Sequence, residues 1–169
     1  MTSLMLKPVS QDPYPAFTLA CHLDAWRIGH GSDAGFDERQ TRAWLHALAR
    51  QRPHGLLHLC HHLCPIGQLA LAPVMVHQDG SRRGHIHLIY LVPQWRGRGL
   101  GCWLLAQALQ RIRAAGCTSA SLRCLSANLA AERFCLRQGW RKEGLPDAEG
   151  QLLITPLPPL PSHHPHLSA

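Results

Sequence analysis

The sequence predicts an α/β fold: one central sheet of six to seven strands with helices packed on it. Two observations predict this class. Short apolar runs of strand length alternate along the chain with longer segments whose apolar residues recur at helical intervals. A glycine-rich turn, Arg96-Gly97-Arg98-Gly99-Leu100-Gly101, stands directly between one such run and one such segment. The 169 residues suffice for one domain with its own core, which we assign to residues 1–157.

The amino-terminal half predicts a strand, two helices and two further strands. Residues 5–9 have strand character, and residues 14–27 and 36–51 carry apolar side chains at helical spacing. The glycine-rich residues between these helices predict a mobile connection. The next two strands are expected at 56–61 and 68–76, around the turn-like sequence Cys64-Pro65-Ile66-Gly67.

The carboxy-terminal half predicts four strands and two helices. After a turn at Asp79-Gly80 the chain continues with a strand, the glycine-rich turn, and a helix with apolar residues at every fourth position that ends at Gly116. The remaining elements are predicted at 119–125 (strand), 128–139 (helix), 140–143 (strand) and 151–157 (strand). Residues 158–169 are rich in Pro and His, so we expect a disordered tail.

The glycine-rich turn has the character of a pyrophosphate site. Its glycines let the backbone approach an anion without an intervening Cβ, and the helix that follows adds its positive end. The turn lacks the Gly-Lys-Ser/Thr ending of a P-loop, and it does not follow the first strand of a repeating strand-helix-strand series. The commonest nucleotide-binding motifs are therefore excluded.

Two blocks together resemble the GCN5-related N-acetyltransferases (GNAT). Leu91-Val92-Pro93 followed by Arg96 to Gly101 resembles the family's Val-x-Pro strand end and its Arg/Gln-x-x-Gly-x-Gly signature. The segment from Asn128 to Trp140 resembles its Asn-x-x-Ala-x-x-Phe-Tyr-x-x-x-Gly-Phe block. The resemblance implies a mixed sheet with splayed fourth and fifth strands and acetyl-CoA as co-substrate, without a metal. It assigns acetyl-CoA binding to Leu91, Val92, Arg96, Gly97, Arg98, Gly99, Leu100, Gly101, Cys102 and Asn128.

Two histidines are candidates for the catalytic base. Acetyl transfer needs a neutral amine, and many family members place a Glu where this chain has His87. His85 lies two residues earlier, so both imidazoles point to the same side of an extended strand. The pair resembles the paired-histidine strand of arylalkylamine N-acetyltransferases, and an ordinary histidine pKa suits a base at neutral pH. The alternative is that both are ordinary residues of a partly solvated strand.

Cys135 stands where the family usually has the Tyr that protonates the departing thiolate. A thiol with an ordinary pKa is mostly protonated at pH 7 and is able to donate a proton. The alternative is that Cys135 is a small apolar side chain that packs its helix on the sheet. The sequence leaves both open.

Trp26 and Asp33 are candidate acceptor contacts, because the family builds its acceptor wall from the first two helices and their link. The alternative is that Asp33 caps a helix and Trp26 fills the core. Cys60-His61-His62-Leu63-Cys64 has metal-ligand residue types, but one short hairpin gives poor tetrahedral geometry, so we predict no metal site.

Composition limits the remaining classes of function. The net charge of +7 suits an anionic partner, but the basic residues form no run and no nucleic-acid motif is present. Seven cysteines, an odd number, and the lack of a leader or a membrane-length apolar run predict a cytoplasmic protein with reduced thiols. We therefore expect an acetyltransferase acting on a small-molecule amine or a protein amino terminus, as a monomer or homodimer. The alternatives are a non-catalytic coenzyme A-binding domain and a basic nucleic-acid-binding module.

Overall fold

The computed structural model describes residues 4–9, 16–51 and 55–158 and confirms the predicted α/β fold. A single seven-stranded sheet has the strand order β1-β2-β3-β4-β5-β7-β6. Its strands are β1 (Leu4–Pro8), β2 (Leu56–His61), β3 (Cys64–Val76), β4 (Arg82–Leu91), β5 (Ser119–Cys124), β6 (Arg141–Asp147) and β7 (Gly150–Pro156). The helices are α1 (Ala16–His30), α2 (Glu38–Gln51), α3 (Leu100–Ala114) and α4 (Leu129–Arg137), with a 3-10 turn at Pro93–Trp95. Of the predicted tail, residues 159–169 lie outside the described residues.

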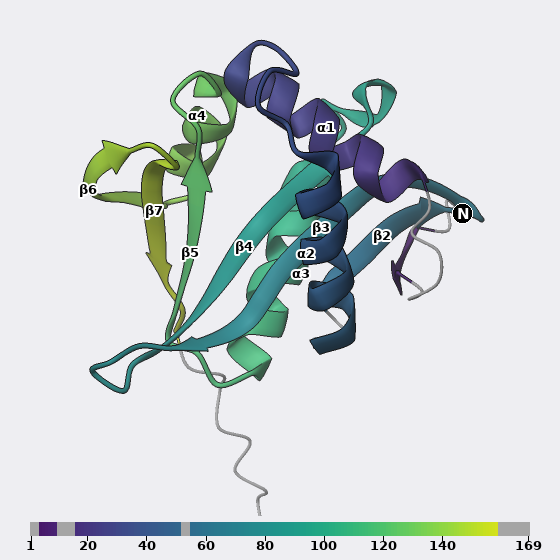
Figure 1. Ribbon diagram of the computed structural model, residues 1–169. Helices are drawn as coiled ribbons and strands as arrows, with labels where there is room; N and C mark the ends of the chain where they lie inside the picture. The colour runs from purple at the N-terminus through teal and green to yellow at the C-terminus, as the bar shows by residue number, and fades with distance from the viewer. Residues whose placement is uncertain (1–3, 10–15, 52–54, 159–169) are drawn as a thin grey trace, which may run out of the picture.

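Helices cover the two faces of the sheet unequally. In Figure 1, α1 and α2 lie in front of the sheet, α2 directly over β3, while α3 lies behind. The predicted four-residue repeat of α3 packs against the strands, and Leu104, Ala108 and Ile112 are fully buried. The β4–β5 pair is parallel, whereas the other pairs are antiparallel, so the sheet is mixed.

The turn expected at Cys64–Gly67 is wrong. These residues belong to β3, and the turn itself consists of His62, at φ 55°, and Leu63. Pairing with β2 overrides the local turn composition, because Pro65 pairs with Cys60 beside a bulge, where a residue without an N–H is tolerated.

The glycine-rich connection between α1 and α2 is held by specific contacts. α1 continues through His30, whose imidazole stacks on Trp26 with ring centroids 3.7 Å apart. The indole Nε1–H of Trp26 donates to the Ala34 carbonyl at 3.2 Å, and Arg27 forms an ion pair with Asp33. These contacts tie the link to α1; the mobility that its composition suggests stays a prediction.

Polar pairs join α1 to the sheet. The three pairs are Thr18 with His58 of β2 (2.9 Å), His22 with Gln68 of β3 (2.8 Å) and Asp24 with Tyr90 of β4 (2.6 Å). At its carboxyl end α1 approaches the residue after β5 so closely that a Cβ on Gly29 would lie 2.2 Å from Leu125 Cδ1. α1 therefore spans the sheet from β2 to the end of β5.

Candidate active site

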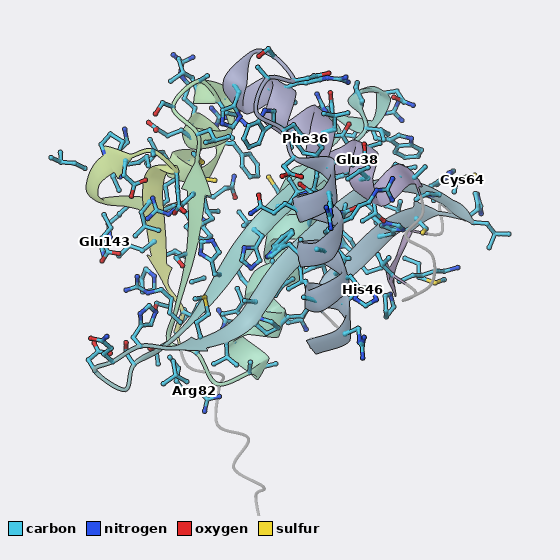
Figure 2. The ribbon with its side chains drawn as sticks, viewed as in Figure 1. Phe36, Glu38, His46, Cys64, Arg82 and Glu143 are labelled. Atoms are coloured by element: carbon cyan, nitrogen blue, oxygen red, sulfur yellow. The ribbon has the colours of Figure 1, made fainter. Side chains whose placement is uncertain are left out.

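The site begins where β4 and β5 separate. The parallel pairing covers only Arg83–Ile86 of β4 and Ser119–Leu122 of β5. Beyond these residues the two strands no longer pair with each other, and Figure 1 shows them diverging toward the end of the sheet near α1 and α4. In Figure 2, Phe36 lies near this open end, and Arg82 lies at the opposite end, where the strands converge. The predicted splay of the fourth and fifth strands is confirmed.

A β-bulge places His87 at the point of separation. Ala70 of β3 pairs with Leu88, and the next residue, Leu71, pairs with Ile86, so His87 is the extra residue of β4. A bulge bends its strand and increases the local twist. It thus turns β4 away from β5 and exposes the imidazole of His87.

A cavity of about 480 Å³ occupies the space between the separated strands. One wall consists of aromatic and imidazole side chains from α1, α2 and their link: His22, Trp26, Phe36 and Trp44. The facing wall comes from β5, the residues after it and α4: Arg123, Cys124, Leu125, Asn128 and Ala131. Between the walls lie His87 and Leu88 of β4. The cavity therefore brings together three predicted site residues, Trp26, His87 and Asn128.

The two candidate histidines have different surroundings. The ring centroids of His85 and His87 are 4.9 Å apart. His85 Nδ1 lies 2.9 Å from Ser121 Oγ, whereas His87 lies edge-on to Trp44 at 5.1 Å. Burial lowers the pKa of His85, and nearby Arg123 lowers it further, against a smaller opposing effect of Glu149. His85 is therefore a neutral neighbour of the more exposed His87.

His22 is a cavity residue that the sequence analysis missed. Burial lowers its pKa to about 4, and the Gln68 amide lies 2.8 Å from its Nε2. Its ring also packs edge-on against Trp44. A lone histidine on a helix gives no sequence signal, because its partners come from β3 and α2.

The glycine-rich turn adopts the conformation that its composition predicts. Gly97 and Gly99 have φ of 73° and 78°, a region that side chains with a Cβ rarely enter. α3 begins directly after Gly99, and no side chain caps its amino terminus. The first N–H groups of the helix, those of Leu100, Gly101 and Cys102, are thus available as donors to an anion.

The two arginines of this turn have different partners. Arg96 Nε donates to the Leu91 carbonyl at 2.8 Å, and its Nη2 lies 3.4 Å from Asp24. Arg98 stacks over Trp95, with the guanidinium 5.0 Å from the ring centroid. Arg96 thus connects the turn to α1, whereas Arg98 contacts only Trp95, which directly precedes the turn, among the interactions described here.

Two residues near the end of β4 form further hydrogen bonds, Val92 through its backbone and Tyr90 through its side chain. The N–H of Val92 donates to the Ile66 carbonyl at 3.0 Å. The hydroxyl of Tyr90 donates to Asp24 Oδ2, and burial together with this bond raises the Tyr90 pKa to about 12. Tyr90 is therefore a weak proton donor at neutral pH.

The remaining predicted residues are divided between α4 and the α1–α2 link. Asn128 is the N-cap of α4, and its Oδ1 accepts from the Ala131 N–H at 3.2 Å. Cys135 is buried in the core and does not line the cavity; its hydrogen bond with the Cys124 thiol, and then burial, hold its pKa well above the usual range. Asp33 pairs with Arg27 on the surface and does not line the cavity either.

Neither a cluster of metal ligands nor a membrane-spanning helix is present among the described residues. No group of three or more His, Cys, Asp or Glu side chains there is arranged to hold a metal ion. The helices in residues 16–51 and 55–158 are all too short or too polar to cross a membrane.

Comparison with known proteins identifies the relatives of this architecture. The model of the acetyltransferase (GNAT) family matches residues 17–140. No curated protein matches the chain in sequence. Among solved structures, a ribosomal-protein-alanine N-acetyltransferase from Brucella melitensis has a TM-score of 0.69 at 17% identity, covering 90% of this chain and 99% of that one. PaiA N-acetyltransferase from Thermoplasma acidophilum, in complex with coenzyme A, has a TM-score of 0.65 at 15% identity and covers 92% and 99%. The structure of yncA from Salmonella typhimurium with its cofactor acetyl-CoA has a TM-score of 0.64 at 14% identity and covers 97% and 99%.

Proposed function

Because the chain belongs to the acetyltransferase (GNAT) family, we propose that it transfers the acetyl group of acetyl-CoA to a primary amine by direct attack. The observation that carries this proposal is the separation of β4 and β5 after Ile86 and Leu122. It opens a cavity that extends from α1 and α2 to α4, with an imidazole at its centre. The glycine-rich turn follows directly on β4, so an anion site and a candidate base belong to one continuous segment.

The chain offers suitable groups for acetyl-CoA, which supplies an acetyl thioester with a good leaving group. The uncapped N–H groups of α3 after Gly99 suit the phosphates. The separated edges of β4 and β5 suit the amides of the pantetheine arm, with Leu91 contributing a carbonyl that it shares with Arg96. Because the Oδ1 of Asn128 caps α4, its Nδ2 is the group offered to acetyl-CoA.

His87 takes the role of base. The amine lone pair attacks the thioester carbonyl carbon, a C–N bond forms, and the C–S bond breaks with its electron pair on sulfur. The amine proton passes to the His87 imidazole, directly or through a water molecule. The lowered pKa of His85 keeps that neighbour neutral, so it adds no positive charge against protonation of His87.

We assign Cys135 a packing role and not that of proton donor. Its pKa is raised by burial and by Cys124, and the thiol lies in the core. The departing thiolate then takes its proton from water.

The proposal is tested by two measurements on the same protein. Calorimetric titration measures acetyl-CoA binding, and release of free coenzyme A thiol is followed with a panel of primary amines. We expect binding, and thiol release that depends on the amine. Binding without amine-dependent release by any amine of the panel would overturn acetyl transfer and favour a non-catalytic coenzyme A-binding domain.

A further inference from the structure

His87 and Arg123 lie just beyond the last pair between β4 and β5. His85 pairs with Ser121 and Ile86 with Leu122. The bulge residue His87 keeps its ring beside that of His85, 4.9 Å between centroids, and Arg123 follows Leu122 where the strands separate. Both line the cavity, so an imidazole and a guanidinium face each other across it.

Arg123 is held in place along one edge. Its Nη1 donates to Asp147 Oδ1 at 2.9 Å and to the Gly150 carbonyl at 3.2 Å. Its Nε lies 3.4 Å from Glu149. Within the described residues Nη2 makes no hydrogen bond. The turn between β6 and β7 therefore fixes the guanidinium while leaving one of its nitrogens for a ligand.

Arg123 makes the electrostatic potential in the cavity positive, although two carboxylates lie beside it. The side chain of Arg123 is 29% exposed, whereas Asp147 and Glu149 are 54% and 79% exposed, so water screens the two carboxylates more strongly. Consistent with this, the pKa of His85 is lowered by Arg123 more than it is raised by Glu149. Among the described residues that line the cavity, Arg123 carries the only formal charge at neutral pH and none is acidic. An acceptor with a second ammonium group is disfavoured, and one with an anionic group is favoured.

Aromatic rings provide the rest of the acceptor surface. Trp26 and Phe36 meet edge to face at 5.8 Å, and Trp44 lies edge-on to His87. The indole of Trp26 is fixed from behind by His30 and by its bond to the α1–α2 link. Rigid rings of this kind bind apolar and aromatic groups with little loss of side-chain freedom.

From this arrangement we propose that the acceptor is a free α-amino acid with an aromatic or large apolar side chain. Its carboxylate binds Arg123, its amine lies at His87, and its side chain lies among Trp26, Phe36 and Trp44. The amine and carboxylate of an α-amino acid are attached to the same carbon, which matches two facing groups on adjacent strands. This proposal rests on the proposed acetyl transfer and makes Arg123 a specificity-determining residue.

The experiment compares acceptors that differ only beside the amine. Phenylalanine and tryptophan are each tested as the free acid, as the amide and as the decarboxylated amine, together with a dipeptide that begins with the same residue. Thiol release from acetyl-CoA gives kcat/KM for each compound. We expect the free acids to exceed the amides, amines and dipeptides by at least about 10-fold, because only the free acids place a carboxylate where Nη2 of Arg123 donates a charged hydrogen bond.

Variants test the role of the guanidinium. Arg123→Gln should raise KM for the free acids about 10- to 100-fold and leave the weaker reaction with the amines nearly unchanged, and Arg123→Lys should recover part of the loss. Arg50→Gln, which removes an exposed arginine from the last turn of α2 outside the cavity lining, is the matched control and should change KM less than twofold. Acetyl-CoA titration on every variant separates this inference from the proposed function. Equal use of acid and amine, preference for the dipeptide, or no turnover of any of these acceptors with acetyl-CoA binding intact would each overturn the amino acid acceptor. If the wild-type protein does not bind acetyl-CoA, the proposed function of acetyl transfer would be overturned instead.

Discussion

The proposed acetyl-CoA site at the glycine-rich turn and the acceptor side of the cavity are built by different means. At the turn, which does not line the cavity, the backbone supplies the groups: glycines with positive φ bend the chain, and the uncapped amino terminus of α3 presents N–H groups. On the acceptor side, side chains from α1, α2, β4 and β5 form it, and each is held by partners far away in sequence. A backbone site binds what is common to all substrates, whereas a side-chain site changes its chemistry with single substitutions. The acceptor side should therefore control turnover and specificity, and the turn should control acetyl-CoA affinity.

The largest effect is expected at the centre of the acceptor side. His87→Gln should lower turnover by roughly 10²- to 10⁴-fold, because the attacking amine loses its base, while acetyl-CoA affinity stays within about twofold. Steady-state kinetics and calorimetric titration measure the two quantities. The exposed His77→Gln in the β3–β4 turn is the control. Turnover of the His87 variant at the wild-type rate would show that His87 is an ordinary strand residue.

The opposite pattern is expected on the turn. In Gly101→Val a new Cβ meets only Phe134, at 3.6 Å within the protein, so the added methyl groups act mainly against the bound phosphates. We expect the Kd for acetyl-CoA to rise about 10- to 100-fold, with kcat at saturating acetyl-CoA nearly unchanged. Ala114→Val, exposed at the far end of the same helix, controls for the cost of a β-branched residue in a helix. An unchanged Kd would show that the glycine-rich turn does not bind acetyl-CoA.

A third test concerns how the buried imidazole of His22, on the acceptor side, makes the stability of the fold depend on pH. His22 has a pKa of about 4 in the folded protein and about 6.5 when unfolded, so lowering the pH protonates the unfolded chain first. The stability that this shift contributes is complete above pH 6.5 and is lost as the pH falls through 4, in total about 3 kcal/mol. His22→Gln keeps a partner for Gln68 but does not titrate, and should flatten denaturant-derived stability between pH 6.5 and 4.

Part of the slope should remain in that variant, because burial also lowers the pKa of His58. The same pH dependence in wild type and His22→Gln would mean that the imidazole is protonated in the fold.

The smallest effect is expected behind the acetyl-CoA side. Cys135→Ala should remain active and lose about 1 kcal/mol of unfolding free energy, because a small buried group is removed. Cys135→Ser should lose more stability, since its hydroxyl is buried beside Cys124. Turnover and chemical denaturation on both variants decide it. An inactive but stable Ala variant would make Cys135 the proton donor after all.

Much of the acetyl-CoA side could be predicted from the sequence because its determinants are local. The conformation of the turn follows from Gly97 and Gly99, and the cap of α4 from Asn128, each within a few residues of its effect. The same local reasoning failed at Cys64–Gly67, where pairing with β2 outweighs turn composition. Local composition can state what a segment tolerates but not which distant strand it meets.

The acceptor side was predicted only in part for the same reason. The position of His87 before the Val-x-Pro strand end predicted it as a candidate, and it lines the cavity, but His22 and Arg123 have partners on other elements and no motif. Asp33 stays a prediction as an acceptor contact: it does not line the cavity, and Arg27 six residues earlier binds its carboxylate. Which of several polar residues reaches a cavity depends on packing between elements, which the linear sequence does not display.

The polar pairs beneath α1 have a consequence for the kinetics of acceptor binding. Apolar surfaces slide over one another at little cost, whereas a shift of α1 along the sheet would break the bonds of Thr18, His22 and Asp24 together. Each buried group left unpaired costs about 1–3 kcal/mol, so displaced positions of α1 are rarely populated. The distance between α1 and β4 is therefore fixed when the chain folds. An acceptor should enter in a single association step with no slow rearrangement of the wall, and its dissociation should follow one exponential.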